Sequence, residues 1–259
     1  ATLAEGRTEI LNAAREPHVR DLCRMLGAMG ARIDGAGSDQ IVIAGGSRLG
    51  GCEHRVIADY LEAGTYAIAT AAVGGNVVIE DSPNDDLIQV LVKLEQAGVE
   101  VRPEGSGLHV RREPGRSIQP VDMGTWVHPG FPTDLQAQYM TLMTQADGET
   151  TISEYLFENR FQHVPELLRM GARITPLGRD AVVHGPSSLH GTDVIVPDIR
   201  SGAALVIAGL CADKVTELGL ARHIDRGYQD MAGKLAALGA RVQRVSPGAP
   251  EPLAAPGFD

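Results

Sequence analysis

The chain has 259 residues, of which 43% are hydrophobic and 22% are charged, as in an ordinary globular protein. Its 33 acidic and 23 basic residues give a net charge of −10, which argues against general binding to nucleic acids or anionic membranes. No apolar run reaches the roughly 20 residues that a membrane span requires. The cysteines Cys23, Cys52 and Cys211 have neither disulfide nor zinc spacing, which favours a reducing cytoplasm.

Residues 1–50 are predicted to hold the last part of one repeat unit. The stretch RTEILNAA is followed by a helix at VRDLCRMLGAMG, just after Pro17, and by strands at ARIDGAG and IVIAGG. By comparison with later copies, ATLAEGRTEILNAA begins partway through a helix. We therefore expect the chain to be the C-terminal part of a longer protein, with 1–50 as the last repeat of a truncated domain.

The same pattern recurs along the chain, a helix that ends at a glycine before a strand begins. The four copies read LGAMGARI, LEQAGVEV, LLRMGARI and LAALGARV, anchored at Gly30, Gly98, Gly171 and Gly239. Their spacing of roughly 70 residues exceeds a solenoid period and fits a small α/β unit. We predict helices over 87–98 and VPELLRMG, a hairpin of VEVRPEG and GLHVRRE, and a strand at ARVQRV.

These repeats predict an α/β (α+β) fold with pseudo-symmetric units. We expect a three-repeat domain over 51–246, entered through the glycine-rich stretch at 46–57. The tail at 247–259 is rich in proline, alanine and glycine and is predicted to be disordered.

Three loops place charged groups between apolar stretches, at related positions of the repeats. FPTDLQAQ (131–138), LFENRFQHVPEL (156–167) and PDIRSG with HIDRGY (197–202 and 223–228) supply Asp134, Arg160, Asp198, Arg200 and Arg226. Guanidinium groups match the oxygens of phosphate and carboxylate, and an aspartate among them can act as a general base. The pattern fits a site for a phosphate-bearing anion, and equally fits ion pairs that only stabilise the loops.

Other motifs give weaker signals. His163 and Glu166 form an H-x-x-E pair with no second pair of ligands, and GGSRLGG at 45–51 matches no dinucleotide or phosphate-loop fingerprint. We expect no metal and no organic cofactor.

The strings NAAREP (12–17), FPTDLQAQ (131–138), FENRFQHVPELLRMGA (157–172) and HIDRGY (223–228) resemble the UDP-N-acetylglucosamine 1-carboxyvinyltransferases, a family of enolpyruvyl transferases. The resemblance covers nearly all of the chain except its tail. It implies an inside-out α/β barrel with strands inside and helices partly buried, here a partial first domain followed by a complete second domain. The missing N-terminal half of the same enzyme would be the partner of this part.

The resemblance also implies a reaction. Enolpyruvyl passes from phosphoenolpyruvate to the 3-hydroxyl of UDP-N-acetylglucosamine with release of phosphate, the first committed step of peptidoglycan synthesis in the cytoplasm. The family's reactive cysteine (aspartate in some members), its mobile loop and much of its uridine pocket would precede residue 1. We therefore expect little turnover from residues 1–259 alone.

Site residues follow from the same resemblance, position by position. Asp134 matches the residue assigned proton abstraction from the sugar hydroxyl, and the backbone at Leu156 matches a contact to the nucleotide sugar. Arg160, Arg200 and Arg226 match arginines around phosphoenolpyruvate.

The remaining matches lie beside that group. Phe157 and Asp198 would line the same cleft, and Glu16 and Asp59 match acidic residues near the domain junction. Tyr60 departs from the family, which commonly has an arginine there.

Two alternatives stay open. A shikimate-pathway enolpyruvyl transferase would carry a lysine and a glutamate ahead of its last helix, where this chain reads RHIDRGYQDMAGKL. A non-catalytic, ligand-binding remnant would retain Asp134 and the arginines for structure only.

Overall fold

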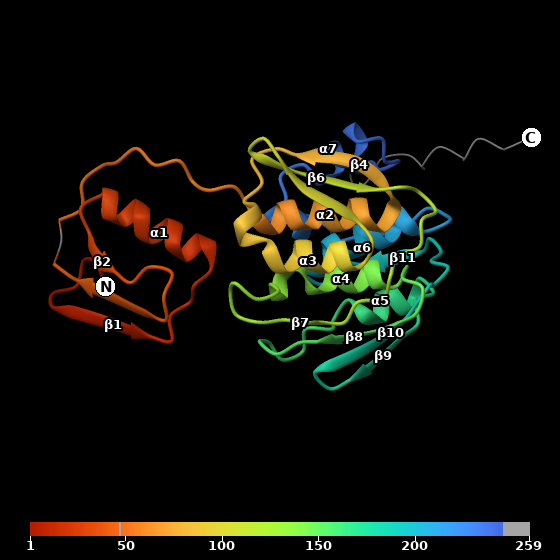
Figure 1. The fold of residues 1–259 in the computed structure, drawn as a ribbon, viewed down its shortest axis with the longest axis horizontal. Helices are drawn as coiled ribbons and strands as arrows, with labels where there is room; N and C mark the ends of the chain where they lie inside the picture. Colours follow the sequence, from red (N-terminus) through yellow and green to blue (C-terminus); the bar gives the residue numbers. More distant parts are fainter. Residues whose placement is uncertain (47, 246–259) are drawn as a thin grey trace, which may run out of the picture.

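The computed structural model describes residues 1–46 and 48–245, which form a smaller and a larger unit joined by an extended segment (Figure 1). In the smaller unit one helix packs on an antiparallel sheet of order β1-β3-β2. Its elements are β1 (Arg7–Leu11), α1 (Pro17–Ala28), β2 (Arg32–Asp34) and β3 (Gln40–Ala44). The expected helix end before β1 is wrong, because residues 1–6 form turns and bends.

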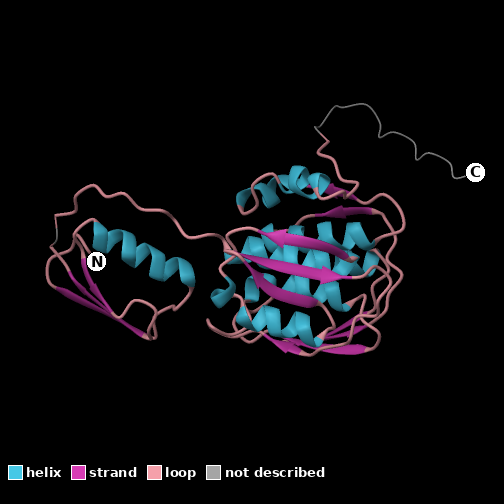
Figure 2. Ribbon diagram, turned by 45° about the horizontal axis from the view of Figure 1, so that its top comes forward, coloured by secondary structure: helices cyan, strands magenta, loops and turns pink. Residues whose placement is uncertain are grey.

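The larger unit is built around three helices that pack against one another, namely α2 (Tyr60–Val73), α4 (Gln136–Met143) and α6 (Ile199–Cys211). Every residue of α4 is buried, and so are most residues of α2 and α6. The expectation of strands inside is therefore wrong: the helices form the centre and the sheets cover them (Figure 2). Helices that are apolar on all sides bury more surface in the middle than strands with one polar face.

Three sheets surround these helices. Their orders are β4-β6-β5, β7-β8-β10-β9 and β11-β12. The strands are β4 (Gly75–Ile79), β5 (Glu100–Glu104), β6 (Gly107–Arg112), β7 (Met123–Gly124), β8 (Glu149–Ser153), β9 (Ile174–Leu177), β10 (Asp180–His184), β11 (Asp193–Ile195) and β12 (Glu217–Gly219). The hairpin predicted after residue 98 is present as β5 and β6, paired from Glu100 with Arg111 to Glu104 with Gly107.

Shorter helices complete the unit. They are α3 (Ile88–Gln96), α5 (Val164–Arg169) and α7 (Met231–Ala237), with 3-10 segments η1 (Asn84–Asp86), η2 (Thr133–Leu135) and η3 (Ala221–Arg226). The predicted helices at 87–98 and VPELLRMG are thus confirmed. The strand predicted at ARVQRV is wrong, because residues 240–245 join no sheet. There Arg244 instead donates two hydrogen bonds to Asp225 of η3, at 2.5 and 2.6 Å.

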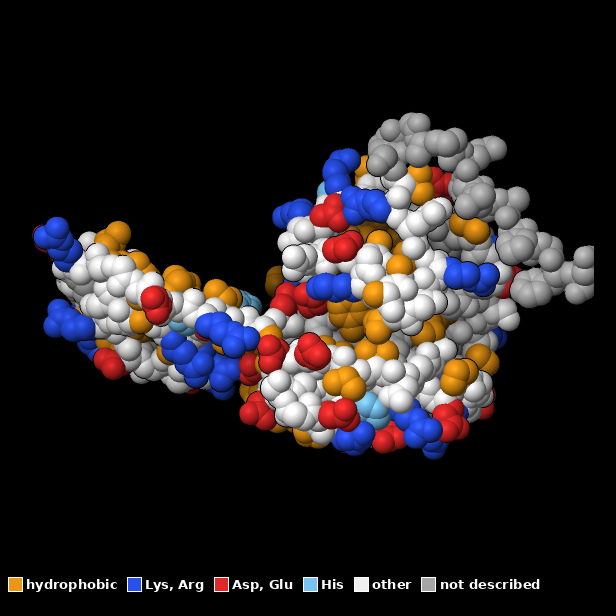
Figure 3. Space-filling model, turned by 90° about the horizontal axis from the view of Figure 1, so that it is seen from above, with side chains coloured by type: hydrophobic (Ala, Val, Ile, Leu, Met, Phe, Trp, Pro, Cys, Tyr) orange, Lys and Arg blue, Asp and Glu red, His pale blue; other side chains and the backbone are white. Residues whose placement is uncertain are grey.

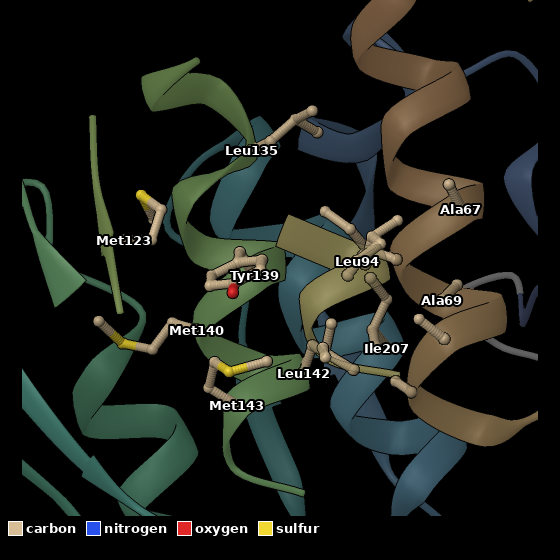
Figure 4. Packing of buried hydrophobic residues seen from close by; sticks show 14 of the residues in the cluster. Ala67, Ala69, Leu94, Met123, Leu135, Tyr139, Met140, Leu142, Met143 and Ile207 are labelled. Carbon is tan, nitrogen blue, oxygen red and sulfur yellow. The ribbon is translucent and has the colours of Figure 1, made fainter. Parts of the chain in front are cut away.

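The core lies where α2, α4 and α6 meet (Figure 4). Tyr139 and Leu142 of α4 are fully buried, as is Ile207 of α6. At Gly64, α2 approaches η2 closely: a Cβ there would lie 2.4 Å from Leu135 Cδ1, and the Leu135 side chain is itself fully buried.

Charged side chains join the two units. Arg20 of α1 forms an ion pair with Asp86 of η1, and His128 Nε2 lies 3.6 Å from the same carboxylate. Basic side chains of the smaller unit and acidic side chains of the larger unit face one another at this junction (Figure 3). The predicted tail at 247–259 lies outside the described residues.

His163 should make the stability of the larger unit sensitive to acid. The side chain is fully buried, with Nε2 3.2 Å from Met140 Sδ, and burial lowers its pKa to about 4. Between pH 6.5 and 4 the unfolded chain therefore binds a proton that the folded chain does not, so stability falls as the pH falls. The loss is about 3 kcal/mol.

We expect His163→Gln to remove this part of the pH dependence. Urea unfolding at pH 7, 5.5 and 4.5 measures it, with the exposed His190→Gln as the control. A variant that loses stability with acid as steeply as the wild type would contradict the assignment.

Candidate active site

Three of the predicted loops meet at one carboxylate. Asp134 on η2 forms an ion pair through Oδ1 with Arg160, and its Oδ2 lies 3.2 Å from Arg200 Nη2 on α6. The side chains of Asp134, Arg160 and Arg200 are 34%, 28% and 19% exposed, so the cluster is accessible but largely desolvated. Electrostatic attraction is stronger there than on an open surface.

Asp198 fixes the first turn of α6, which carries Arg200. Its carboxylate accepts hydrogen bonds from the backbone N–H groups of Arg200 (2.8 Å) and Ser201 (3.0 Å), and from the Ser201 hydroxyl. Burial acts to raise the pKa of Asp198, but these hydrogen bonds outweigh it and hold the pKa below its ordinary value. Asp198 is therefore a helix cap that orients Arg200.

A network of buried polar side chains contacts Arg200 and the backbone of Asp134. The Arg200 guanidinium lies over the ring of Tyr228, with Cζ 5.9 Å from the centroid. The Tyr228 hydroxyl is 2.9 Å from Thr65 Oγ1 of α2, and Gln138 Nε2 donates to Tyr228 Oη (3.2 Å) and to the carbonyl of Asp134 (3.0 Å). The network ties α2, α4 and the turn after η3 to Asp134 and Arg200.

Sequence reasoning missed these supporting residues. Gln138 carries the one usable signal, since it follows Asp134 by four residues at a helix start and so shares its face. Thr65 and Tyr228 lie 163 residues apart, and nothing in either local sequence indicates that they meet.

Leu156 and Phe157 precede Arg160 in the same loop, and Phe157 contacts the Arg160 side chain. The Arg160 guanidinium stacks over the Phe157 ring, with Cζ 5.0 Å from the centroid. The backbone N–H of Leu156 donates to the buried carboxylate of Glu154 at 2.9 Å. A cavity of about 360 Å³ opens beside Arg160 and Phe157.

Arg226 does not join the cluster. It is exposed at the end of η3 and forms no ion pair within residues 1–46 and 48–245. Its neighbours nevertheless approach the site, since a Cβ on Gly227 would lie 3.5 Å from Arg200 Nη1.

Glu16 and Asp59, the acidic residues expected near the domain junction, lie close enough to Tyr60 for their charges to affect its hydroxyl, as does Asp134. Asp59 caps α2 by accepting from the backbone N–H groups of Leu61 (2.8 Å) and Glu62 (3.2 Å). Burial raises the pKa of Tyr60, and the negative charges of Asp134, Glu16 and Asp59 raise it further. Tyr60 therefore stays neutral among carboxylates.

The arrangement suits an anion and a hydroxyl. The N-termini of α2 and α6 are already capped by the carboxylates of Asp59 and Asp198, so the positive charge offered to an anion comes from side chains. Two guanidinium groups add positive charge around one candidate base, Asp134. Among the described residues no cluster of three or more His, Cys, Asp or Glu side chains could hold a metal ion.

Known proteins give a consistent comparison. Residues 1–235 match the family model of EPSP synthase (3-phosphoshikimate 1-carboxyvinyltransferase). UDP-N-acetylglucosamine 1-carboxyvinyltransferases from Sorangium cellulosum (strain So ce56) and Gluconobacter oxydans (strain 621H) are 54% and 48% identical, over 95% of this chain and 58% of each relative. The enolpyruvyl transferase NikO from Streptomyces tendae superposes with a TM-score of 0.79 at 29% identity, over 93% of this chain and 57% of NikO.

The fold is thus the mixed α/β fold of enolpyruvyl transferases. EPSP synthase from Acinetobacter baumannii shares it with a TM-score of 0.67 at 20% identity, over 93% of this chain and 58% of that one. The chain belongs to the EPSP synthase family of carboxyvinyltransferases. It spans 58% of the length of the curated relatives named above. Within the described part, no helix is long and apolar enough to cross a bilayer.

The arginine cluster should bind small anions in this chain. We expect phosphate or phosphoenolpyruvate to raise the melting temperature by about 3 °C at ten times the dissociation constant. Arg160→Met and Arg200→Met should abolish the rise, because each removes one guanidinium from the cluster. Differential scanning fluorimetry with an anion titration measures it.

The matched controls are Arg102→Met and Arg111→Met, which change exposed arginines of the β5–β6 hairpin outside the cluster. Both should retain the rise. Equal anion responses in all four variants would show that Arg160 and Arg200 serve only as structural ion pairs.

Proposed function

We propose that the full-length protein to which this chain belongs transfers enolpyruvyl from phosphoenolpyruvate to the 3-hydroxyl of UDP-N-acetylglucosamine. The observation that supports this most is Asp134 held between Arg160 and Arg200, a candidate base beside two anion-binding groups. The names of the relatives at 48% and 54% identity favour this acceptor.

In the proposed reaction Asp134 takes the proton of the acceptor hydroxyl. The hydroxyl oxygen would bond to C2 of phosphoenolpyruvate while C3 gains a proton from an acid supplied by the N-terminal half, which gives a tetrahedral phospholactoyl adduct. Return of a proton from C3 to that group and departure of phosphate from C2 would then restore the double bond in the product. Arg160 and Arg200 would hold the carboxylate and phosphate and stabilise developing negative charge. Arg226 would reach the donor only after the site closes.

Other residues would bind and position. The backbone at Leu156 would contact the nucleotide sugar, and Phe157 would line the cleft beside Arg160. Asp198 would hold the first turn of α6. Glu16 and Asp59 would keep the junction acidic around Tyr60.

We propose that residues 1–50 are the last repeat of one barrel domain and 51–246 a complete second domain, with the other repeats and the reactive cysteine or aspartate supplied by the N-terminal half. Turnover by residues 1–259 alone would then be small. The acceptor is a precursor of the bacterial wall, so we place the protein in the cytoplasm and in cell-wall synthesis, and through it in cell shape and division.

Asp134→Asn tests the function in the full-length enzyme. We expect kcat for phosphate release to fall by about 10² to 10⁴, because the amide cannot accept the proton. The assay is phosphate release from phosphoenolpyruvate in the presence of UDP-N-acetylglucosamine. Asp225→Asn, which changes an exposed aspartate paired with Arg244, is the control.

Replacing the acceptor discriminates between the alternatives. Turnover with shikimate 3-phosphate but not with the nucleotide sugar would favour the shikimate-pathway enzyme. Binding of both substrates without turnover by the full-length wild type would favour a non-catalytic remnant.

A further inference from the structure

Glu154 is a buried carboxylate that the reaction as proposed does not use. It follows directly on β8 and is 1% exposed. A carboxylate in such a place is costly unless hydrogen bonds replace its water. Here both oxygens are satisfied, and the donors come from three separate segments of the chain.

One oxygen holds the segment that leads to Arg160. Glu154 Oε1 accepts from the backbone N–H groups of Leu156 (2.9 Å) and Phe157 (3.0 Å) and from the Thr125 hydroxyl (2.8 Å). Thr125 Oγ1 in turn accepts from the N–H of Tyr155 at 3.0 Å. Three consecutive backbone amides are thus fixed from one side.

The other oxygen holds the candidate base. Glu154 Oε2 accepts from the Thr133 hydroxyl at 2.8 Å, and Thr133 is the residue before Asp134 on η2. A single rigid carboxylate therefore sets the distance between the backbone at Leu156 and the start of η2.

We propose that Glu154 is a positioning residue that couples the acceptor-binding backbone to the base. Oε1 keeps the Leu156 segment in place for the nucleotide sugar, and Oε2 keeps Asp134 in place for its hydroxyl. The identity of the acceptor rests on the proposed function. The coupling itself rests on the four hydrogen bonds.

We call Glu154 and its hydrogen bonds the clamp, with an Oε1 arm to Thr125, Leu156 and Phe157 and an Oε2 arm to Thr133. Breaking each arm should have a different kinetic effect. Thr133→Val removes the Oε2 arm while keeping side-chain shape, so kcat should fall about tenfold with KM for UDP-N-acetylglucosamine within about twofold. Thr125→Val removes a bond on the Oε1 arm, so the same KM should rise about tenfold with little change in kcat. A hydrogen bond to a charged acceptor is worth about that factor.

The chain offers matched controls for both variants. Thr150 of β8 is also buried, and within the described residues its hydroxyl has no hydrogen-bond partner. Thr150→Val therefore makes the same change in shape without breaking a bond. Thr125→Ser and Thr133→Ser keep the hydroxyl, so both variants should have wild-type kinetics.

Steady-state kinetics of the full-length enzyme measures the split. Valine variants whose KM and kcat both match those of Thr150→Val would overturn the proposal, and so would serine variants as impaired as the valines. An equal loss of kcat in both valine variants, with KM unchanged, would show general loosening of the site in place of two separate arms.

Hydrogen exchange in this chain separates the clamp from the proposed function. Glu154→Gln should speed exchange of the Leu156 and Phe157 amides about tenfold or more, since a neutral acceptor binds them more weakly. Thr150→Val should leave both unchanged. Unchanged protection in Glu154→Gln overturns the clamp, whereas an inactive full-length wild type overturns the proposed function without touching the exchange result.

Discussion

The mutual packing of three buried helices is the constraint on which the rest of this structure depends. The helices α2, α4 and α6 are buried along most of their length and contact one another directly. That packing fixes where each helix begins. The loops that enter the helices are consequently brought together, although their residues are far apart in sequence.

An aspartate stands at or just before the start of each central helix. Asp59 and Asp198 cap α2 and α6 with their side chains, whereas Asp134 precedes α4 and has Arg160 and Arg200 as its partners. At two of the three helices this aspartate therefore serves as a cap, and at the third its carboxylate pairs with two arginines instead. That difference sets the Asp134 cluster apart from the other two helix starts.

The side chains that hold the charged cluster in place are polar and buried, and their hydrogen bonds fix where each charged group lies. Tyr228 and Gln138 hold Arg200 and the backbone of Asp134 from one side, and Glu154 holds the loop and η2 from the other. Such networks stabilise a single arrangement because any buried group that loses its partner is costly. Sequence reasoning identified the charged residues but found neither support, since those contacts join segments that lie far apart.

Sequence alone determined the helices from Ile88 and Val164 and the β5–β6 hairpin, because periodicity, glycine ends and turn residues act locally. It also singled out Asp134, Arg160 and Arg200 as charges set between apolar runs. Only the tertiary structure decided that helices occupy the centre, that ARVQRV forms no strand, and that Asp134 pairs with Arg160 and Arg200 while Arg226 is exposed. Those outcomes depend on which buried faces meet and on which partner each backbone group finds, and both are settled by packing across the whole chain.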